Sequence, residues 1–260
     1  MTSRPYITPE ALLEIRFRGR ARPRWDIGVL CFRDTRGSEA LVRALGARPV
    51  AGKTLYGLEE SDAHPSVFEV DLGRCRVTLV ARCLWGAPQA AILVEELACL
   101  GARVVVGYGA TGGLVPELAK GTQVVASTGL ATDGTSRAYT AHPEVPGDPG
   151  LIDVLGVVAS RLGVALATAR VATVDALFRE TAEDVQRWLA LGAQAINMET
   201  TPLYAAAAAC GVRSLWLGHV SDTLSLTTRH WESWERPAAL TEVTVALTVG
   251  LLEELAAKEP

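Results

Sequence analysis

The chain has 260 residues, of which 49% are apolar and 21% are charged. A chain of this length and apolar content can bury a sizeable core, which excludes an intrinsically disordered protein. Its 25 basic and 29 acidic residues give a net charge of −4, which argues against a basic nucleic-acid-binding surface. We therefore expect a globular protein with no nucleic-acid partner.

Cysteine spacing and hydropathy argue against further classes of protein. The five cysteines lack C-x-x-C spacing, which argues against a disulfide framework and against a zinc site, so we expect no metal. The first 25 residues lack the apolar segment of a signal peptide, and no stretch is long and apolar enough to span a bilayer. These observations predict a cytoplasmic location and no membrane partner.

After residue 25, short apolar runs alternate with longer amphipathic segments. The apolar runs predict strands over 26–32, 67–73, 76–83, 103–109, 123–132, 164–175, 195–199 and 213–222. The amphipathic segments predict helices over 37–45, 88–102, 150–162, 181–193, 201–211 and 238–258. Polar segments rich in turn residues predict loops over 133–150 and 225–237.

This alternation indicates an α/β fold with a largely parallel or mixed sheet. No internal repeat or linker divides the chain, so we expect a basic N-terminal arm over 1–25 and a single domain over 26–260. Ligands of open α/β sheets bind beyond the carboxyl ends of the strands. The candidate site residues therefore follow the predicted strands: Arg33, Asp34 and Arg36; Trp85–Pro88; Gly107–Gly113; Asp175–Glu180; Met198 and Glu199; Ser221 and Asp222.

Three of these segments each allow two interpretations. The glycine-rich segment 107–113 is no P-loop; it is either an anion-binding turn with exposed amides or a tight turn between strands. Glu199 follows a buried strand, so it either accepts hydrogen bonds from sugar hydroxyls or caps the next helix. Asp222 is either a general acid in an apolar cleft or an N-cap or turn aspartate.

Five sequence motifs resemble a known family. The segments GATGGL, DGTSRAY, TVDALFRE, INMETTPLYAAAAACGV and HVSD occur in the order and spacing of the nucleoside phosphorylase superfamily, over about residues 26–255. That superfamily contains purine nucleoside and uridine phosphorylases and methylthioadenosine nucleosidases. The resemblance implies a single α/β domain whose mixed, barrel-like central sheet is flanked by helices. It also implies a homo-oligomer, either a dimer or a trimer of dimers.

The resemblance assigns roles to residues that match the motifs. Glu199 would hold the ribose hydroxyls while Met198 packs against the sugar, and Asp222 would protonate the imidazole nitrogen of a purine. Tyr6 stands where many phosphorylases place a histidine that reaches the sugar in a neighbouring subunit. The remaining matches would form the base site: Thr111, Gly112, Leu177, Phe178 and Ser221.

The phosphate site departs from the family pattern. Of the usual G-D-P-x-R after the first strand, only Arg36 matches, and Gly107 and Ala110 stand where phosphorylases carry an arginine and a hydroxyl. Arg33, Arg48 or Arg137 could replace that arginine. Asp34 could instead activate water, as a carboxylate does in the nucleosidases.

We therefore expect cleavage of the N-glycosidic bond of a purine-type nucleoside, by phosphorolysis to free base and sugar 1-phosphate. Phosphate would be the co-substrate, the nucleoside the partner, and no cofactor is expected. Two alternatives remain open. The first is a hydrolytic nucleosidase that acts on an unusual nucleoside, and the second is a non-catalytic nucleoside-binding homologue.

Overall fold

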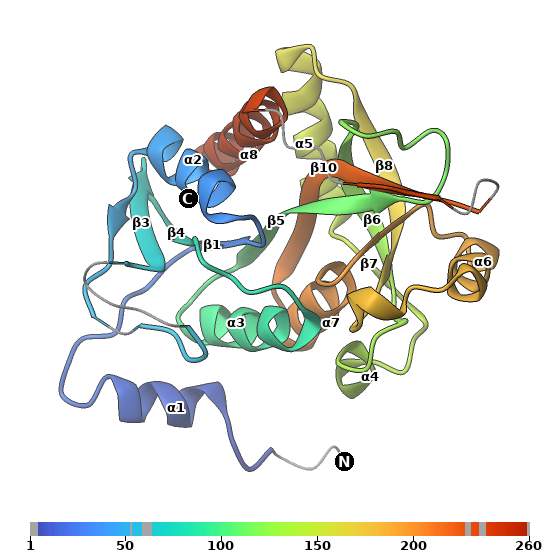
Figure 1. The fold of residues 1–260 in the computed structure, drawn as a ribbon. Helices are drawn as coiled ribbons and strands as arrows, with labels where there is room; N and C mark the ends of the chain where they lie inside the picture. Colours follow the sequence, from blue (N-terminus) through green and yellow to red (C-terminus); the bar gives the residue numbers. More distant parts are fainter. Residues whose placement is uncertain (1–4, 53, 59–63, 227–229, 234–237, 259–260) are drawn as a thin grey trace.

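The computed structural model describes residues 5–52, 54–58, 64–226, 230–233 and 238–258. Within these residues, eleven strands join in one mixed sheet (Figure 1). The strands are β1 (Ile27–Cys31), β2 (Arg48–Pro49), β3 (Val67–Leu72), β4 (Cys75–Val80), β5 (Val104–Gly113), β6 (Gln123–Leu130), β7 (Glu144–Pro146), β8 (Leu166–Thr173), β9 (Ala195–Asn197), β10 (Arg213–Ser225) and β11 (His230–Glu232). The helices are α1 (Pro9–Arg16), α2 (Thr35–Leu45), α3 (Ala87–Cys99), α4 (Ser136–Tyr139), α5 (Pro149–Leu162), the 3₁₀ helix η1 (Leu177–Arg179), α6 (Ala182–Ala190), α7 (Thr200–Cys210) and α8 (Ala238–Lys258).

Five strands close on themselves. Each pairs with the next in the order β10, β6, β8, β9, β5, and β5 pairs again with β10. The ring is mixed, because β5 is parallel to β10 but antiparallel to β9. From β5 the sheet continues through β1 and β4 to β3 and β2. This confirms the single α/β domain with a barrel-like mixed sheet that the motifs implied.

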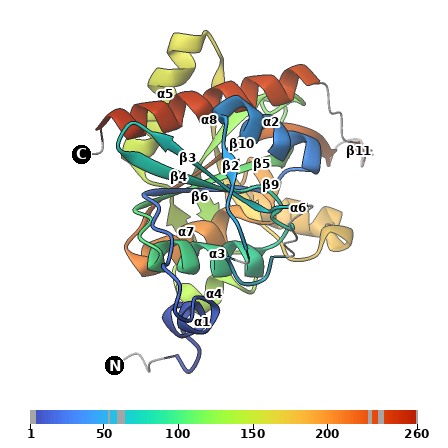
Figure 2. The same cartoon turned by 90° about the vertical axis from the view of Figure 1, so that its left-hand side faces the viewer.

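Helices cover both faces of the sheet. In Figure 2, α2, α5 and α8 lie along one face, and α1, α3, α4 and α7 lie along the other. Two apolar clusters fill the layers: one joins α3 and α7 to the sheet, and the other joins α2, α5 and α8 to it. Both faces of β1 are buried, which explains its unbroken apolar sequence.

Local signals set several helix boundaries. Thr181 forms a capping box with Asp184 at the start of α6. Helices α2, α5 and α7 end at glycines in the left-handed conformation, as is usual for helix ends. Residues 5–25, predicted as an arm, contain α1, whose Leu13 is buried in the cluster with α3. The predicted domain boundary at residue 26 stays a prediction.

The predicted glycine-rich turn is wrong. Residues 107–113 continue strand β5, which pairs with β10 along this whole segment, with β1 as far as Tyr108 and with β9 at Gly112 and Gly113. The glycines make room for Trp216 of β10. A Cβ on Gly107 would lie 2.6 Å from Cδ1 of Trp216, and one on Gly109 would lie 2.8 Å from its Cζ2.

The two predicted loops also contain regular structure. The segment 133–150 includes α4 and β7, and β7 pairs with β6. The segment 225–237 includes β11, which pairs with the end of β10; its residues 227–229 and 234–237 lie outside the described part. The five cysteines all lie in the described residues, and none of them forms a disulfide there. In the residues described here, every helix is too short or too polar to cross a membrane.

Candidate active site

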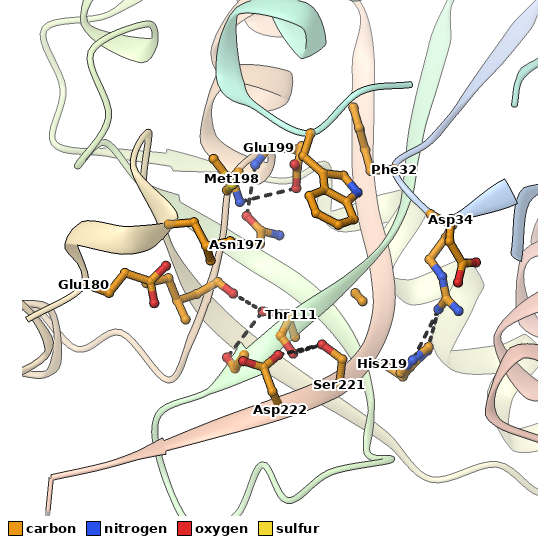
Figure 3. A pocket seen from close by; sticks show the side chains of 16 residues that line it. Phe32, Asp34, Thr111, Glu180, Asn197, Met198, Glu199, His219, Ser221 and Asp222 are labelled. Atoms are coloured by element: carbon orange, nitrogen blue, oxygen red, sulfur yellow. Dashed lines mark hydrogen bonds between the residues drawn. The ribbon is translucent and has the colours of Figure 1, made fainter. Parts of the chain in front are cut away.

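One pocket lies where the ends of several strands meet. Strands β1, β5 and β10 run parallel side by side, so the residues after Cys31, around Ala110 and around Ser221 lie at the same end of the sheet. The loop after β9 and the segment around η1 complete the pocket (Figure 3). Its lining residues are Phe32, Arg33, Asp34, Trp85, Ala110, Thr111, Gly112, Leu177, Glu180, Ile196, Asn197, Met198, Glu199, His219, Ser221 and Asp222.

A β-bulge places Asp222 in the pocket. Val220 pairs with Thr111 of β5 and Asp222 pairs with Gly112, so Ser221 is an extra residue on β10. Such bulges redirect side chains and occur often beside active sites. One oxygen of the Asp222 carboxylate accepts from the Ser221 hydroxyl at 2.7 Å, and the other accepts from Nε1 of Trp231 at 3.0 Å. Asp222 thus lies inside a strand, which removes its interpretation as a turn residue.

Glu199 is buried in a different corner of the pocket from Asp222. It is 4% exposed, and its Oε1 accepts from the backbone N–H of Gly86 at 3.0 Å. Gly86 has a φ of +125°, a conformation that favours glycine, and this turn aims its amide at the carboxylate. The cap of α7 comes instead from Asn197, whose Oδ1 accepts from the N–H groups of Glu199 and Thr200. The carboxylate of Glu199 is therefore not used as a helix cap.

Burial sets the charge state of Glu199. Removal from water raises its pKa to about 7, and the hydrogen bonds from the Gly86 and Met198 amides act in the opposite direction. The neighbouring Met198 side chain lines the same corner of the pocket. A buried carboxyl group beside a thioether matches a site for sugar hydroxyls and the apolar face of a sugar ring.

Arg33 brings a positive charge to the third corner. It is 8% exposed, and its Nη1 donates to the ring of His219, with Nη1–Nδ1 at 2.9 Å. Its Nη2 donates to the hydroxyl of Thr241 at 3.2 Å, and its guanidinium lies 5.8 Å from the centre of the Tyr108 ring. Burial, followed by the charge of Arg33, lowers the pKa of His219 to about 4. His219 is therefore a neutral acceptor, and the charge of Arg33 remains available to an anion.

The other predicted phosphate-site residues take different places. Asp34 lines the pocket, and its Oδ1 accepts from the N–H of Gly37 at 2.8 Å as the cap of α2. Ala110 also lines the pocket. Arg36 lines a separate groove between α2 and α8. Its role toward phosphate stays a prediction that this placement does not support.

Two of the predicted sugar and base residues lie outside the pocket of one chain. Tyr6 and Phe178 are not among its lining residues, and both side chains are highly exposed. A role for Tyr6 toward the sugar of a neighbouring subunit would need a second copy of the chain. The remaining predicted residues line the pocket: Thr111, Gly112, Leu177, Met198, Glu199, Ser221 and Asp222.

The sequence interpretation missed several lining residues. His219, which sequence alone leaves with a core or supporting role, lines the pocket, pairs with Ala110 in the β5–β10 ladder and contacts Arg33. Glu180 ends a candidate segment but received no role. Trp85 likewise belongs to a candidate segment without a role, and Phe32, Ile196 and Asn197 carried no signal beyond their positions near strand ends.

Comparisons with known proteins identify the family of the chain. The sequence profile of the phosphorylase superfamily matches residues 42–254. The guanosine phosphorylase of Halorubrum lacusprofundi is 31% identical over 131 residues, which cover 50% of this chain and 54% of that protein. A DeoD-type purine nucleoside phosphorylase of Streptococcus pyogenes is 28% identical over 169 residues, 64% of this chain and 70% of that protein. The chain thus spans about half the length of the first relative.

Solved structures share the fold over almost the whole chain. The AMP nucleosidase from Bacteroides thetaiotaomicron has a TM-score of 0.72 at 18% identity, with 96% of both chains covered. The Campylobacter jejuni 5'-methylthioadenosine/S-adenosyl homocysteine nucleosidase has a TM-score of 0.68 at 15% identity, covering 90% of this chain and 100% of that one. At such identities the likeness establishes the fold only. The profile match covers most of the sequence, and the chain therefore belongs to the phosphorylase superfamily.

Proposed function

We propose that this protein cleaves the N-glycosidic bond of a purine nucleoside by phosphorolysis, releasing the free base and the sugar 1-phosphate. The observation that carries the proposal is the meeting of Glu199, Asp222 and Arg33 in one pocket. Each side chain suits one group in the reaction: Glu199 suits the sugar, Asp222 the leaving base and Arg33 the incoming anion. The curated relatives named guanosine phosphorylase and purine nucleoside phosphorylase support the same reaction class.

The bond between C1' of the sugar and the base breaks through an oxocarbenium-like sugar, and its electron pair moves into the purine. Asp222, as the carboxylic acid, transfers a proton to the imidazole nitrogen of that purine, so that the base leaves neutral. Glu199 accepts hydrogen bonds from the vicinal hydroxyls and orients the ring. Its buried carboxylate also stabilises positive charge that develops on the sugar.

The phosphate oxygen then bonds to C1' from the side of Arg33. A guanidinium whose hydrogen bonds in the described residues go to uncharged partners, His219 and Thr241, keeps its charge for the dianion. Gly107 and Ala110 supply no side-chain donor at the two β5 positions where the family carries an arginine and a hydroxyl. Arg33 therefore takes the place of the arginine that the family carries on β5.

Hydrolysis is the second candidate, because Asp34 lines the same corner as Arg33 and could accept a proton from water. Solved structures with this fold include proteins named AMP nucleosidase and 5'-methylthioadenosine/S-adenosyl homocysteine nucleosidase, which fits this alternative. A catalytically inert nucleoside-binding protein is the third.

A product analysis separates these candidates. The purified protein is incubated with inosine, guanosine, adenosine, methylthioadenosine and uridine, each with and without phosphate, and the products are resolved by chromatography. Phosphorolysis predicts purine release and sugar 1-phosphate only in the presence of phosphate, with uridine uncleaved. Base release in phosphate-free buffer would establish hydrolysis, and binding of nucleosides without any release would establish the inert homologue.

A further inference from the structure

Helix α8 contacts the Arg33–His219 pair through two hydroxyl groups. Thr241 accepts from Nη2 of Arg33 at 3.2 Å, and Oγ1 of Thr244 lies 3.1 Å from Nδ1 of His219. Residues three positions apart share one face of a helix, so α8 presents both hydroxyls to the pair. Thr244 is fully buried and does not line the pocket, and the proposed reaction gives it no role.

Either ring nitrogen of His219 is close enough to accept from Arg33. Nη1 of Arg33 lies 2.9 Å from Nδ1 and 3.2 Å from Nε2. Burial, followed by the charge of Arg33, lowers the pKa of His219 to about 4, so the ring is neutral at neutral pH. A neutral imidazole carries one proton, and only the nitrogen without it can accept from the guanidinium. The tautomer of His219 therefore decides how Arg33 is held.

The surroundings of Thr244 select one tautomer. Its hydroxyl has a single proton and two oxygen acceptors at 2.9 Å, which are Oε1 of Gln123 and the backbone carbonyl of Leu240. If the amide of Gln123 were turned over, its nitrogen would donate to the hydroxyl, and the carbonyl of Leu240 would still take the proton. In both cases the oxygen of Thr244 is left as an acceptor toward Nδ1 of His219. Nδ1 then carries the ring proton, and Nε2 is free to accept from Arg33.

We propose that Thr244 is a positioning residue for the arginine that binds phosphate. It accepts from Nδ1–H of His219, which leaves Nε2 to accept from Arg33 and holds the guanidinium toward the anion. This inference rests on the proposed function and extends it to a residue outside the pocket. Without the hydroxyl, the ring can carry its proton on Nε2, where it would oppose the N–H of Arg33 and turn the guanidinium away.

The tautomer is measured directly in the ligand-free protein at neutral pH. The chain has four histidines, so isotope-labelled histidine gives few signals in a long-range proton–nitrogen correlation spectrum. His219→Gln identifies the signals of that ring, which should show a protonated Nδ1 and an unprotonated Nε2. Thr244→Val keeps the shape of the side chain but removes the hydroxyl, and it should shift the ring toward a protonated Nε2.

Steady-state kinetics with varied phosphate measure the consequence. Thr244→Val should raise the KM for phosphate by about 3- to 10-fold, which corresponds to the loss of one hydrogen bond. The KM for inosine and kcat, measured at saturating phosphate, should change little, because the hydroxyl acts only on the anion corner. Thr244→Ser restores the hydroxyl and should restore both the tautomer and the KM.

Thr248→Val is the matched control. Thr248 lies one turn further along α8 and is equally buried, but its hydroxyl donates to the backbone carbonyl of Thr244 at 2.8 Å. The substitution therefore makes the same change of side chain in the same helix and leaves the hydroxyl of Thr244 in place. It should keep the tautomer of His219 and the KM for phosphate of the unmodified protein.

A protonated Nε2 on His219 in the unmodified protein would overturn the proposal. So would an unchanged KM for phosphate in Thr244→Val, or an equal rise in Thr248→Val, because the effect would then come from packing of α8. If phosphate is not a substrate, the proposed function fails, and calorimetry with inorganic phosphate replaces the kinetics. Weaker phosphate binding by Thr244→Val than by Thr248→Val would then support the positioning role, and equal binding or none by either variant would reject it.

Discussion

The guanidinium of Arg33 and the ring of His219 lie 2.9 Å apart although the two residues are separated by 186 positions in the sequence. The sheet brings them together: β1 and β10 both pair with β5 in parallel, so the residue two positions beyond β1 lies beside His219. Since His219 is neutral, the contact orients the guanidinium without cancelling its charge. A cation held in this way, at the end of three parallel strands, is suited to bind an anionic nucleophile.

Arg33→Met should raise the KM for phosphate by about 10- to 100-fold, since charge-assisted hydrogen bonds contribute about 1.5–3 kcal/mol. The KM for the nucleoside, measured at saturating phosphate, should change little. Arg36→Met provides the comparison, because Arg36 lines the groove between α2 and α8. Steady-state kinetics with varied phosphate decide between the two arginines. A large effect of Arg36→Met with little effect of Arg33→Met would assign the phosphate to Arg36, as the family motif predicts.

Asp222→Asn should lower kcat for inosine by about 100- to 10,000-fold, because the amide cannot supply the proton that the leaving base requires. The substitution keeps the shape of the side chain and an oxygen that can accept from Ser221. 7-Methylguanosine is the matched substrate, since its imidazole ring already carries a positive charge and needs no proton to leave. The variant should cleave it at a rate within about tenfold of the unmodified protein. An equal loss with both substrates would show that Asp222 acts by binding the base and not by donating a proton.

Much of the fold is predictable because the apolar residues of this chain are spaced differently in its strands and in its helices. The buried strands β1 and β5 read as apolar runs, and α6 begins at a threonine with an acidic residue three positions later. The course of residues 107–113 was not predictable in this way. Those glycines indicate a turn by local rules, and only their contact with the distant Trp216 explains why they form a strand.

The residues of the candidate site likewise fall into two groups, those that the sequence identifies and those that only the folded structure identifies. Glu199 and Asp222 belong to motifs with recognisable spacing, so the sequence is sufficient to single them out. Arg33 could not be chosen among three arginines without the parallel pairing of β1, β5 and β10. The bulge at Ser221 could not be predicted either. A bulge is a mismatch in the pairing of two strands, so the sequence of β10 alone does not show it.

Glu199 should make the stability of the ligand-free protein depend on pH. Its folded pKa of about 7 lies above its ordinary value of 4.5, so the folded state holds the proton more tightly than the unfolded state. Stability is therefore greatest below the unfolded value and decreases as the pH rises toward 7. Glu199→Gln should remove this loss, raising the free energy of unfolding at pH 8 relative to pH 5 by about 1–3 kcal/mol compared with the unmodified protein.

Urea unfolding at the two pH values measures this difference. Glu183→Gln serves as the control, since its carboxylate is exposed and its removal should leave the pH dependence unchanged. The Oε1 of the glutamine can still accept from Gly86, so the fold at this corner is retained. If Glu199→Gln and the unmodified protein lose stability equally between pH 5 and pH 8, the carboxyl group does not titrate in that range.

Gly107→Ala should destabilise the protein, whereas Gly156→Ala should stabilise it. A Cβ on Gly107 would lie 2.6 Å from Trp216 and 2.9 Å from Leu203, both in the core, and such overpacking costs about 1–3 kcal/mol. Gly156 lies inside α5, where a Cβ would meet nothing within 4 Å, so alanine should add up to about 1 kcal/mol through its helix propensity. Thermal unfolding of the two variants should give shifts of opposite sign.

The same clash predicts that Gly107→Arg cannot restore the family's phosphate contact on β5, because Trp216 occupies the space where that side chain would begin. A Gly107→Arg variant that folds normally and lowers the KM for phosphate would refute this packing argument and would support an anion site on β5.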